Sequence, residues 1–302
     1  MIRTRVLVLG LSLVGLAAPA IASEGMPALN ALETECAMQA ASSFEPGFET
    51  IGRPLSMLDL DATVQACWAA MGSGDNDFRM NAWMARAYYA AGQYADAFYF
   101  ADRAAENDVP LGLYLAGVLY SAGQGVDADT GRGAELLMAA VEAGFAPAFH
   151  ALAISLLNGT GVNVDTDLAV DFLQLAADEG FGPAATTLGR MYLAGVGVPS
   201  DEMEAYRLMR LGAHYGDAQA FYELGHYAEV GIAGPVDPQT AVFNYFTAVD
   251  LGNKDALLPL AKLLLTGKGV DRNPAAAREL LTQAAADGSS EAVQLLDQMA
   301  PS

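Results

Sequence analysis

Residues 188–216 read LGRMYLAGVGVPSDEMEAYRLMRLGAHYG, and this stretch decides the fold. It begins with a large side chain next to a small one, Leu188-Gly189, so that a helix can pack into a core and let its neighbour come close. The helix is expected to end at Gly195, because a residue without a Cβ turns the chain easily. Asp201 then accepts hydrogen bonds from the N–H groups that begin a second helix. The second helix runs to Gly216, so the stretch predicts a pair of helices joined by a loop.

The same pattern recurs every 36 residues in four independent columns of the sequence. Two columns are glycines, one is alanine and one is a helix cap. They are Gly123, Gly159, Gly195, Gly231 and Gly267; Gly144, Gly180, Gly216, Gly252 and Gly288; Ala148, Ala184, Ala220, Ala256 and Ala292; and Asp129, Asp165, Asp201, Asp237 and Asn273. Four columns in one register, without an insertion, indicate a repeat protein made of stacked helix pairs.

The repeat resembles the Sel1-like repeat family, relatives of the tetratricopeptide repeat with a longer loop. The matching words are GQGV at 123–126, GTGV at 159–162, GVGV at 195–198 and GKGV at 267–270. The corresponding loop at 231–236, GIAGPV, lacks the second glycine, so we expect a reshaped loop between unchanged helices. The resemblance implies an all-α, right-handed superhelical solenoid with an extended curved surface that suits peptides and protein segments.

The sequence on either side of these repeats predicts the ends of the solenoid. Residues 82–108 resemble a shorter tetratricopeptide-type pair, and two earlier helices are expected at 27–41 and 60–71, joined by residues 43–54. The expected organisation is a signal peptide at 1–22, an N-terminal helical cap at 23–77, the shorter pair at 78–110, five repeats at 111–290 and a C-terminal capping half-repeat at 291–302.

Cys36 and Cys67 are the only cysteines, one on each helix of the predicted cap. An even pair in an oxidising compartment indicates a disulfide. Closing the loop between the two cysteines would stabilise the fold by roughly 3–4 kcal/mol on the loop-entropy model. A redox-active or metal-binding pair is the alternative, but the chain has no CxxC motif and no histidine nearby.

The first residues predict export. Arg3 and Arg5 precede an apolar run from Val6 to Leu16, and Ala20-Ile21-Ala22 offers a small-x-small cleavage site before Ser23. This order is typical of a secretory signal peptide, so we expect a secreted or periplasmic protein with no membrane insertion after cleavage. The chain has 36 acidic and 15 basic residues, a net charge of −21. Nucleic acid is therefore excluded as a partner, because two negative surfaces repel each other.

No pattern in the sequence predicts catalysis, a cofactor or a metal. The three histidines, His150, His214 and His226, occupy three different repeat columns, whereas a metal site needs convergent ligands. The acidic pairs at 127–129 and 165–167 lack the remaining ligands of a calcium loop. The GxGV motifs recur in step with the repeat, which indicates a structural turn between helices rather than a phosphate-binding loop.

The face formed by the first helices is the candidate binding site, because first helices line the concave groove of tetratricopeptide-type solenoids. By the repeat register, one column is Arg86, Val118, Ile154, Arg190, His226 and Lys262, and its neighbour is Tyr114, His150, Thr186, Tyr222 and Leu258. We predict a basic, aromatic stripe of Arg190, His226, Lys262, Tyr222 and Tyr114 that selects an acidic protein segment. The alternative is that these are solvated helix positions which happen to be basic.

The sequence thus predicts a non-enzymatic scaffold or adaptor that binds another protein in the cell envelope. The resemblance implies a role similar to that of scaffold and adaptor proteins, including extracytoplasmic regulators of envelope sensor kinases, so a periplasmic regulator is one form of the expected role. The competing interpretation is an envelope enzyme or a binder of cell-wall fragments. A cluster of acid, base or nucleophile side chains in the groove would favour that interpretation.

Overall fold

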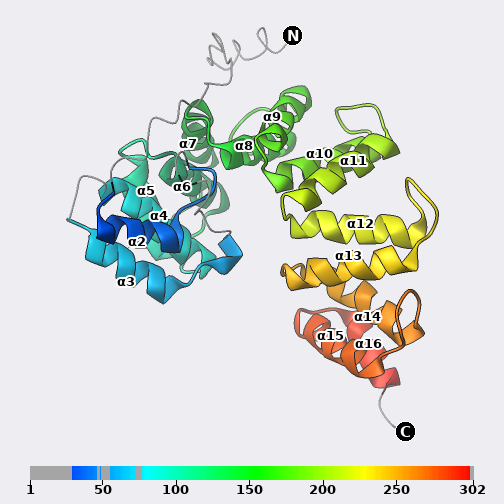
Figure 1. The fold of residues 1–302 in the computed structure, drawn as a ribbon. Helices are drawn as coiled ribbons and strands as arrows, with labels where there is room; N and C mark the ends of the chain where they lie inside the picture. Colours follow the sequence, from blue (N-terminus) through cyan, green and yellow to red (C-terminus); the bar gives the residue numbers. More distant parts are fainter. Residues whose placement is uncertain (1–28, 46–47, 49–54, 73–76, 300–302) are drawn as a thin grey trace. The chain divides into compact units, whose positions relative to one another are not determined.

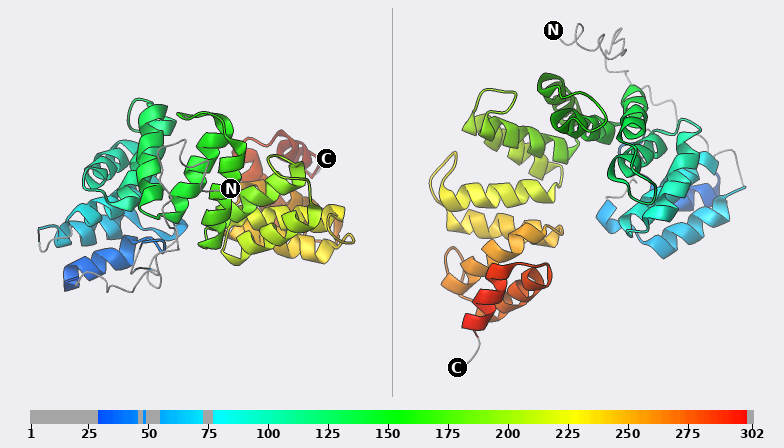
Figure 2. Two further views of the ribbon diagram at one scale, coloured as in Figure 1. Left: turned by 90° about the horizontal axis from the view of Figure 1, so that it is seen from above. Right: turned by 180° about the vertical axis from the view of Figure 1, so that it is seen from behind.

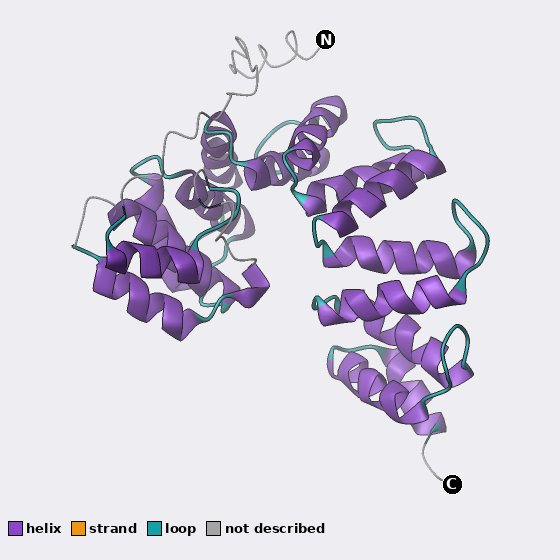
Figure 3. Ribbon diagram, viewed as in Figure 1, coloured by secondary structure: helices purple, strands orange, loops and turns teal. Residues whose placement is uncertain are grey.

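The computed structural model describes residues 29–45, 48, 55–72 and 77–299, so the predicted signal peptide at 1–22 lies outside the described residues. Every described residue is in a helix, a turn or a loop (Figure 3). Fifteen α-helices occur in this part of the chain. Among them, none combines the length and the apolar character that crossing a bilayer requires. The all-helical fold class is confirmed.

The chain divides into two compact units, residues 1–175 and 176–302, which are described separately. Unit 1 contains α2 (Ala31–Ala40), η2 (Leu55–Met57), α3 (Leu60–Ala70), α4 (Asp77–Ala90), α5 (Tyr94–Ala105), α6 (Pro110–Ala122), α7 (Thr130–Glu142) and α8 (Ala146–Asn158), and α9 (Thr166–Asp178) crosses the boundary. Unit 2 contains α10 (Gly182–Ala194), α11 (Glu202–His214), α12 (Ala218–Val230), α13 (Pro238–Asp250), η3 (Lys254–Ala256), α14 (Leu257–Thr266), α15 (Pro274–Ala286) and α16 (Ser290–Gln298).

Within each unit the helices form antiparallel pairs that stack in chain order (Figures 1 and 2). The predicted glycine and helix-cap positions produce these pairs. In the five 36-residue repeats, each first helix ends at a glycine in the left-handed region, such as Gly195 with φ 68°. Each second helix begins at the predicted cap; for example, the Asp201 carboxylate accepts hydrogen bonds from the N–H groups of Met203 and Glu204. Alanines with no exposed surface, such as Ala184 and Ala220, let the helices approach closely.

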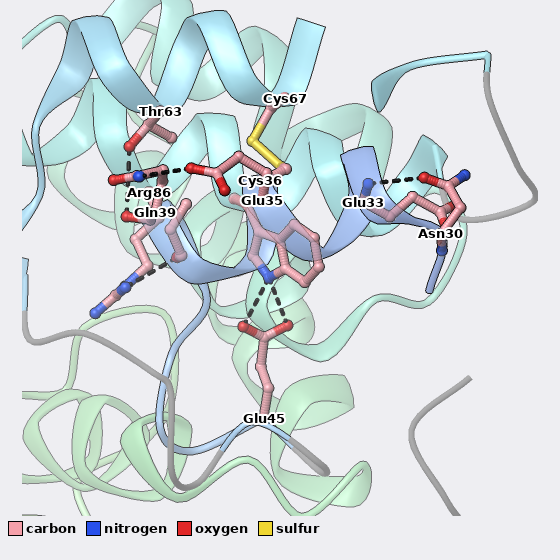
Figure 4. Close-up of a disulfide and its surroundings, with 11 residues drawn as sticks. Asn30, Glu33, Glu35, Cys36, Gln39, Glu45, Thr63, Cys67 and Arg86 are labelled. Atoms are coloured by element: carbon pink, nitrogen blue, oxygen red, sulfur yellow. Dashed lines mark hydrogen bonds between the residues drawn. A yellow bond between two sulfur atoms is a disulfide. The ribbon is translucent and has the colours of Figure 1, made fainter. Parts of the chain in front are cut away.

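The N-terminal helices are joined by the predicted disulfide. Cys36 on α2 and Cys67 on α3 are bonded, both are completely buried, and their Cα atoms are 4.6 Å apart (Figure 4). Helix α3 matches the predicted range closely. Helix α2 begins at Ala31 rather than at the predicted residue 27, because Asn30 caps it and the Asn30 N–H donates a hydrogen bond to the Glu33 carboxylate.

The second glycine of the GxGV word lets two backbones touch. A Cβ built on Gly161 would overlap the carbonyl oxygen of Thr130, the first residue of α7. Gly125 lies in the same way against Tyr94, and Gly269 lies against Pro238. Each of these loops therefore rests on the start of the second helix of the preceding pair, which a side chain would prevent.

Helices α12 and α13, on either side of the loop at 231–236, keep 13 residues each, so the helices are unchanged as predicted. Ala233 stands where the other units have the second glycine, and it holds a left-handed φ of 57°. A Cβ makes this conformation unfavourable by about 1–2 kcal/mol. This repeat therefore keeps the register at the expense of local backbone strain.

We expect Gly161→Ala to destabilise the fold more than Gly144→Ala does. Both glycines have left-handed φ values, +73° and +76°, but a Cβ on Gly144 would meet nothing within 4 Å. Gly144→Ala should therefore cost about 1 kcal/mol from backbone strain alone. Gly161→Ala should cost about 3 kcal/mol, because overpacking against Thr130 adds to that strain. Urea denaturation followed by circular dichroism measures both, and equal losses would contradict the close backbone contact.

Candidate functional site

Four of the five predicted stripe residues lie on the first helices of unit 2. Arg190 is on α10, Tyr222 and His226 are on α12, and Lys262 is on α14. We call the surface that these four residues form the first-helix face of unit 2. The Arg190 side chain is 63% exposed and the Lys262 side chain is 43% exposed. His226 is also exposed, so all three basic side chains can be reached by a partner.

Two of these cations already have acidic neighbours on the next first helix. Arg190 Nε lies 3.7 Å from Glu223 Oε1 on α12, and Lys262 Nζ lies 2.6 Å from Glu291 Oε1 on α16. The Arg190 contact is longer than a hydrogen bond. Exposed ion pairs contribute about 0–1 kcal/mol, so a partner can replace the Lys262–Glu291 pair at little cost. The Glu223 side chain is only 13% exposed, so its contact with Arg190 is more sheltered from solvent. The stripe is therefore a row of cations alternating with acids rather than a purely basic surface.

Tyr222 is held from behind by the second helix of its own pair. Its ring lies 5.9 Å from the ring of buried Tyr245 on α13, whose hydroxyl donates a 2.8 Å hydrogen bond to Glu229 Oε2. Burial raises the pKa of Tyr222, the nearby Glu223 carboxylate raises it further, and Arg190 partly opposes the shift. Tyr222 therefore stays a neutral phenol that presents a fixed, half-buried ring to the face.

The fifth predicted residue, Tyr114, belongs to unit 1 and is not part of the face just described. It lies on α6, with its ring 5.4 Å from the ring of Phe145. Burial raises the pKa of Tyr114 to about 12, Tyr89 adds to the shift, and Arg86 opposes it.

Arg86 shares the repeat column of Arg190, yet its surroundings are different. It is only 7% exposed, and its Nη1 donates 3.0 Å hydrogen bonds to the carbonyl oxygens of Ala40 and Ala41 (Figure 4). These two residues end α2. Burial lowers the pKa of Arg86 to about 10, and the carboxylate of Glu45 partly opposes this shift. The chain's own residues therefore cover the inner column at α4.

The turn after α2 brings an acid onto the same surface. Glu45 is buried, and Trp83 Nε1 donates hydrogen bonds of 3.2 and 3.0 Å to its two carboxylate oxygens. The Ser42 N–H donates a 2.8 Å hydrogen bond to Glu45 Oε2. Burial raises the pKa of Glu45, and these hydrogen bonds together with Arg79 and Arg86 oppose the shift. Phe48 completes the cover, with its ring edge-on to Trp83 at 5.3 Å.

The sequence patterns did not predict the two acids, Glu223 beside Arg190 and Glu45 near Arg86. The register could have found Glu223, because it lies three residues before His226 on one helix face. Nothing in the repeat pattern points to Glu45, because the connection that carries it is outside the repeats. Within the described residues, no group of three His, Cys, Asp or Glu side chains is arranged to hold a metal ion.

Comparison with known proteins identifies the repeats. The family model described as Sel1 repeat matches residues 110–145, 146–181, 183–217, 218–253 and 255–289. Among curated proteins, none matches.

Among solved structures, a Sel1 repeat protein from Oxalobacter formigenes is similar with a TM-score of 0.63 and 25% identity, over 72% of this chain and 89% of that one. A protective antigen of uropathogenic Escherichia coli with an SLR fold has a TM-score of 0.56 and 23% identity, over 78% of this chain and 50% of that one. The immunity protein PA5088 from Pseudomonas aeruginosa has a TM-score of 0.50 and 22% identity, over 67% of this chain and 80% of that one. The last two show likeness of fold alone.

His150, on first helix α8, makes stability depend on pH. Burial lowers its pKa to about 4, from about 6.5 in an unfolded chain. The unfolded state therefore binds the proton first, so stability is constant above pH 6.5 and falls as the pH drops towards 4. The loss reaches roughly 2–3 kcal/mol at pH 4. His150→Tyr should remove this part of the acid sensitivity, because tyrosine stands at the equivalent positions 114 and 222. Unfolding free energies of both proteins at pH 7 and 4.5 test this, and equal acid losses would contradict it.

Proposed function

The chain belongs to the Sel1 repeat family, and from this membership we propose that it is an exported scaffold or adaptor that binds a protein segment in the cell envelope. Sel1 repeat proteins are generally scaffolds for protein–protein interaction. A periplasmic regulator is one form that this role takes. The proposal assigns the chain binding rather than catalysis, and no observation favours the alternative of an envelope enzyme or a binder of cell-wall fragments.

The observation that carries the proposal is the row of accessible basic side chains on three successive first helices of unit 2, Arg190, His226 and Lys262. An extended chain covers about 10 Å in three residues, so its side chains can be spaced to meet successive helices. A segment lying across these helices can therefore present an acidic side chain to each of these basic residues. Tyr222 supplies a rigid ring of the type enriched at binding hot spots.

The net charge of −21 supports the choice of partner. Because acids dominate the rest of the surface, an acidic segment is repelled everywhere except where cations gather, and this repulsion sharpens selectivity. The same charge disfavours nucleic acid and anionic membrane surfaces.

The buried Cys36–Cys67 disulfide supports a location outside the cytoplasm. Disulfides persist in oxidising compartments and are rare where thiols are kept reduced. Together with the predicted signal peptide, this supports a secreted or periplasmic protein.

Export predicts that the mature protein begins at Ser23. A signal peptidase should cut after Ala22, so N-terminal sequencing of protein taken from the cell envelope should read Ser-Glu-Gly. A mature chain that still begins at Met1 would remove the basis for the envelope role.

The binding role predicts that Arg190→Ala/Lys262→Ala weakens capture of the native partner by about ten-fold, equivalent to about 1.4 kcal/mol. The protein serves as bait in envelope extracts, and bound partner is quantified by mass spectrometry against the unmodified chain. Helix content should not change, because substitutions at exposed positions usually cost little.

The matched control is Arg207→Ala/Lys268→Ala, which removes the same charge from unit 2 at exposed positions on α11 and in a loop. It should leave capture unchanged. If both double variants lose capture equally, the effect is one of overall charge and the first-helix face is not the site.

A further inference from the structure

The same arginine–tyrosine pair occurs twice in this chain. Arg86 on α4 is paired with Tyr114 on α6, and Arg190 on α10 is paired with Tyr222 on α12. In each case the arginine is close enough to oppose the rise in the pKa of the tyrosine. By register the positions are equivalent, because each tyrosine lies four residues before the next member of the arginine column, Val118 or His226.

In unit 1 the arginine of this pair is occupied by the chain itself. Helix α2 stops at Ala40, which leaves carbonyl groups at its C-terminus without partners in the helix. The Arg86 guanidinium donates to two of these oxygens, on Ala40 and Ala41. The C-terminal end of a helix carries partial negative charge, so a cation is favoured there.

A carboxylate completes the occupied site. The chain turns after α2, with the Glu45 N–H donating to the Ser42 carbonyl oxygen at 3.1 Å. This turn brings the Glu45 carboxylate into the field of Arg86 and against Trp83 Nε1. The occupant is therefore a helix end followed, within five residues, by a glutamate.

We infer that Arg190 and Tyr222 form an open copy of this site, and that they receive a helix end and a following glutamate from another protein. This inference rests on the proposed function and names the partner's chemistry at one position. The open state is visible in the exposure of the two arginines, since 63% of the Arg190 side chain is exposed and Arg86 is 7% exposed.

Two substitutions distinguish the open copy from the occupied one. Glu223 stands where unit 1 has Leu115, and its carboxylate competes for Arg190 from 3.7 Å. Thr187 stands where unit 1 has Trp83, so the indole donor is missing. Both changes weaken the binding of the ligand, so the open site is expected to bind weakly and reversibly rather than to bury its occupant.

The test uses a peptide of residues 37–45, AMQAASSFE, with blocked ends and a fluorescent label. Its anisotropy is measured against the full-length mature protein with the disulfide intact. Saturable binding is expected. Arg190→Ala should weaken it at least ten-fold, and a peptide with Glu45→Gln should bind at least five-fold more weakly. Glu223→Gln should strengthen binding about three-fold, because it removes the competing carboxylate. Arg207→Ala, the matched control, should have no effect.

Two results would overturn the inference. One is binding that Arg190→Ala leaves unchanged, which would place the peptide elsewhere, including by exchange at Arg86. The other is an absence of saturable binding by both the unmodified protein and Glu223→Gln.

Lys262→Ala separates this inference from the proposed function. The peptide spans only one arginine–tyrosine pair, so its affinity should not change in Lys262→Ala, whereas capture of the native partner should fall. Loss of partner capture in Arg190→Ala/Lys262→Ala without any peptide binding would leave the proposed function standing and refute the open copy.

Discussion

Backbone-to-backbone contact between neighbouring pairs is the constraint on which the rest of the structure depends. The GxGV loops at Gly125, Gly161 and Gly269 press their main chain against the residue that starts the preceding second helix. Such an approach fixes where each pair stands relative to the one before it. Side chains at equivalent positions therefore recur on successive first helices, and the repeat register predicts which residues share one surface. Ala233 shows that the register survives when one glycine is lost, although the backbone still takes the left-handed turn.

This constraint also explains how far the sequence predicts the molecule. Glycine and cap columns are local signals, since Gly195 and Asp201 act within a few residues of themselves, and the helix pairs follow from them. The disulfide followed from counting cysteines. The register also placed Arg190, His226 and Lys262 at equivalent helix positions, and all three are accessible on unit 2. Whether a partner uses them is a separate question that a column pattern does not address.

What the sequence did not reveal depends on contacts between residues far apart in the chain. Arg86 belongs to the same column as Arg190, but a turn that lies outside the repeats covers it. Its buried acid, Glu45, lies 38 residues before Trp83, to which it is hydrogen bonded. The carboxylates beside Arg190 and Lys262 come from the next first helix. The position of each basic residue in its own helix does not reveal this acidic neighbour. A repeat register identifies equivalent positions but not equivalent neighbours.

The disulfide has a consequence for competition between ligands. Because Cys36 is bonded to Cys67, the helix whose end fills the Arg86 site stays tethered to α3 even when it detaches. A tethered group of this kind acts at an effective concentration on the order of millimolar. A free protein of equal intrinsic affinity at micromolar concentration is therefore outcompeted about a thousand-fold at Arg86. The covalent bond therefore directs external partners away from the N-terminal end of the array and leaves the untethered positions to receive them.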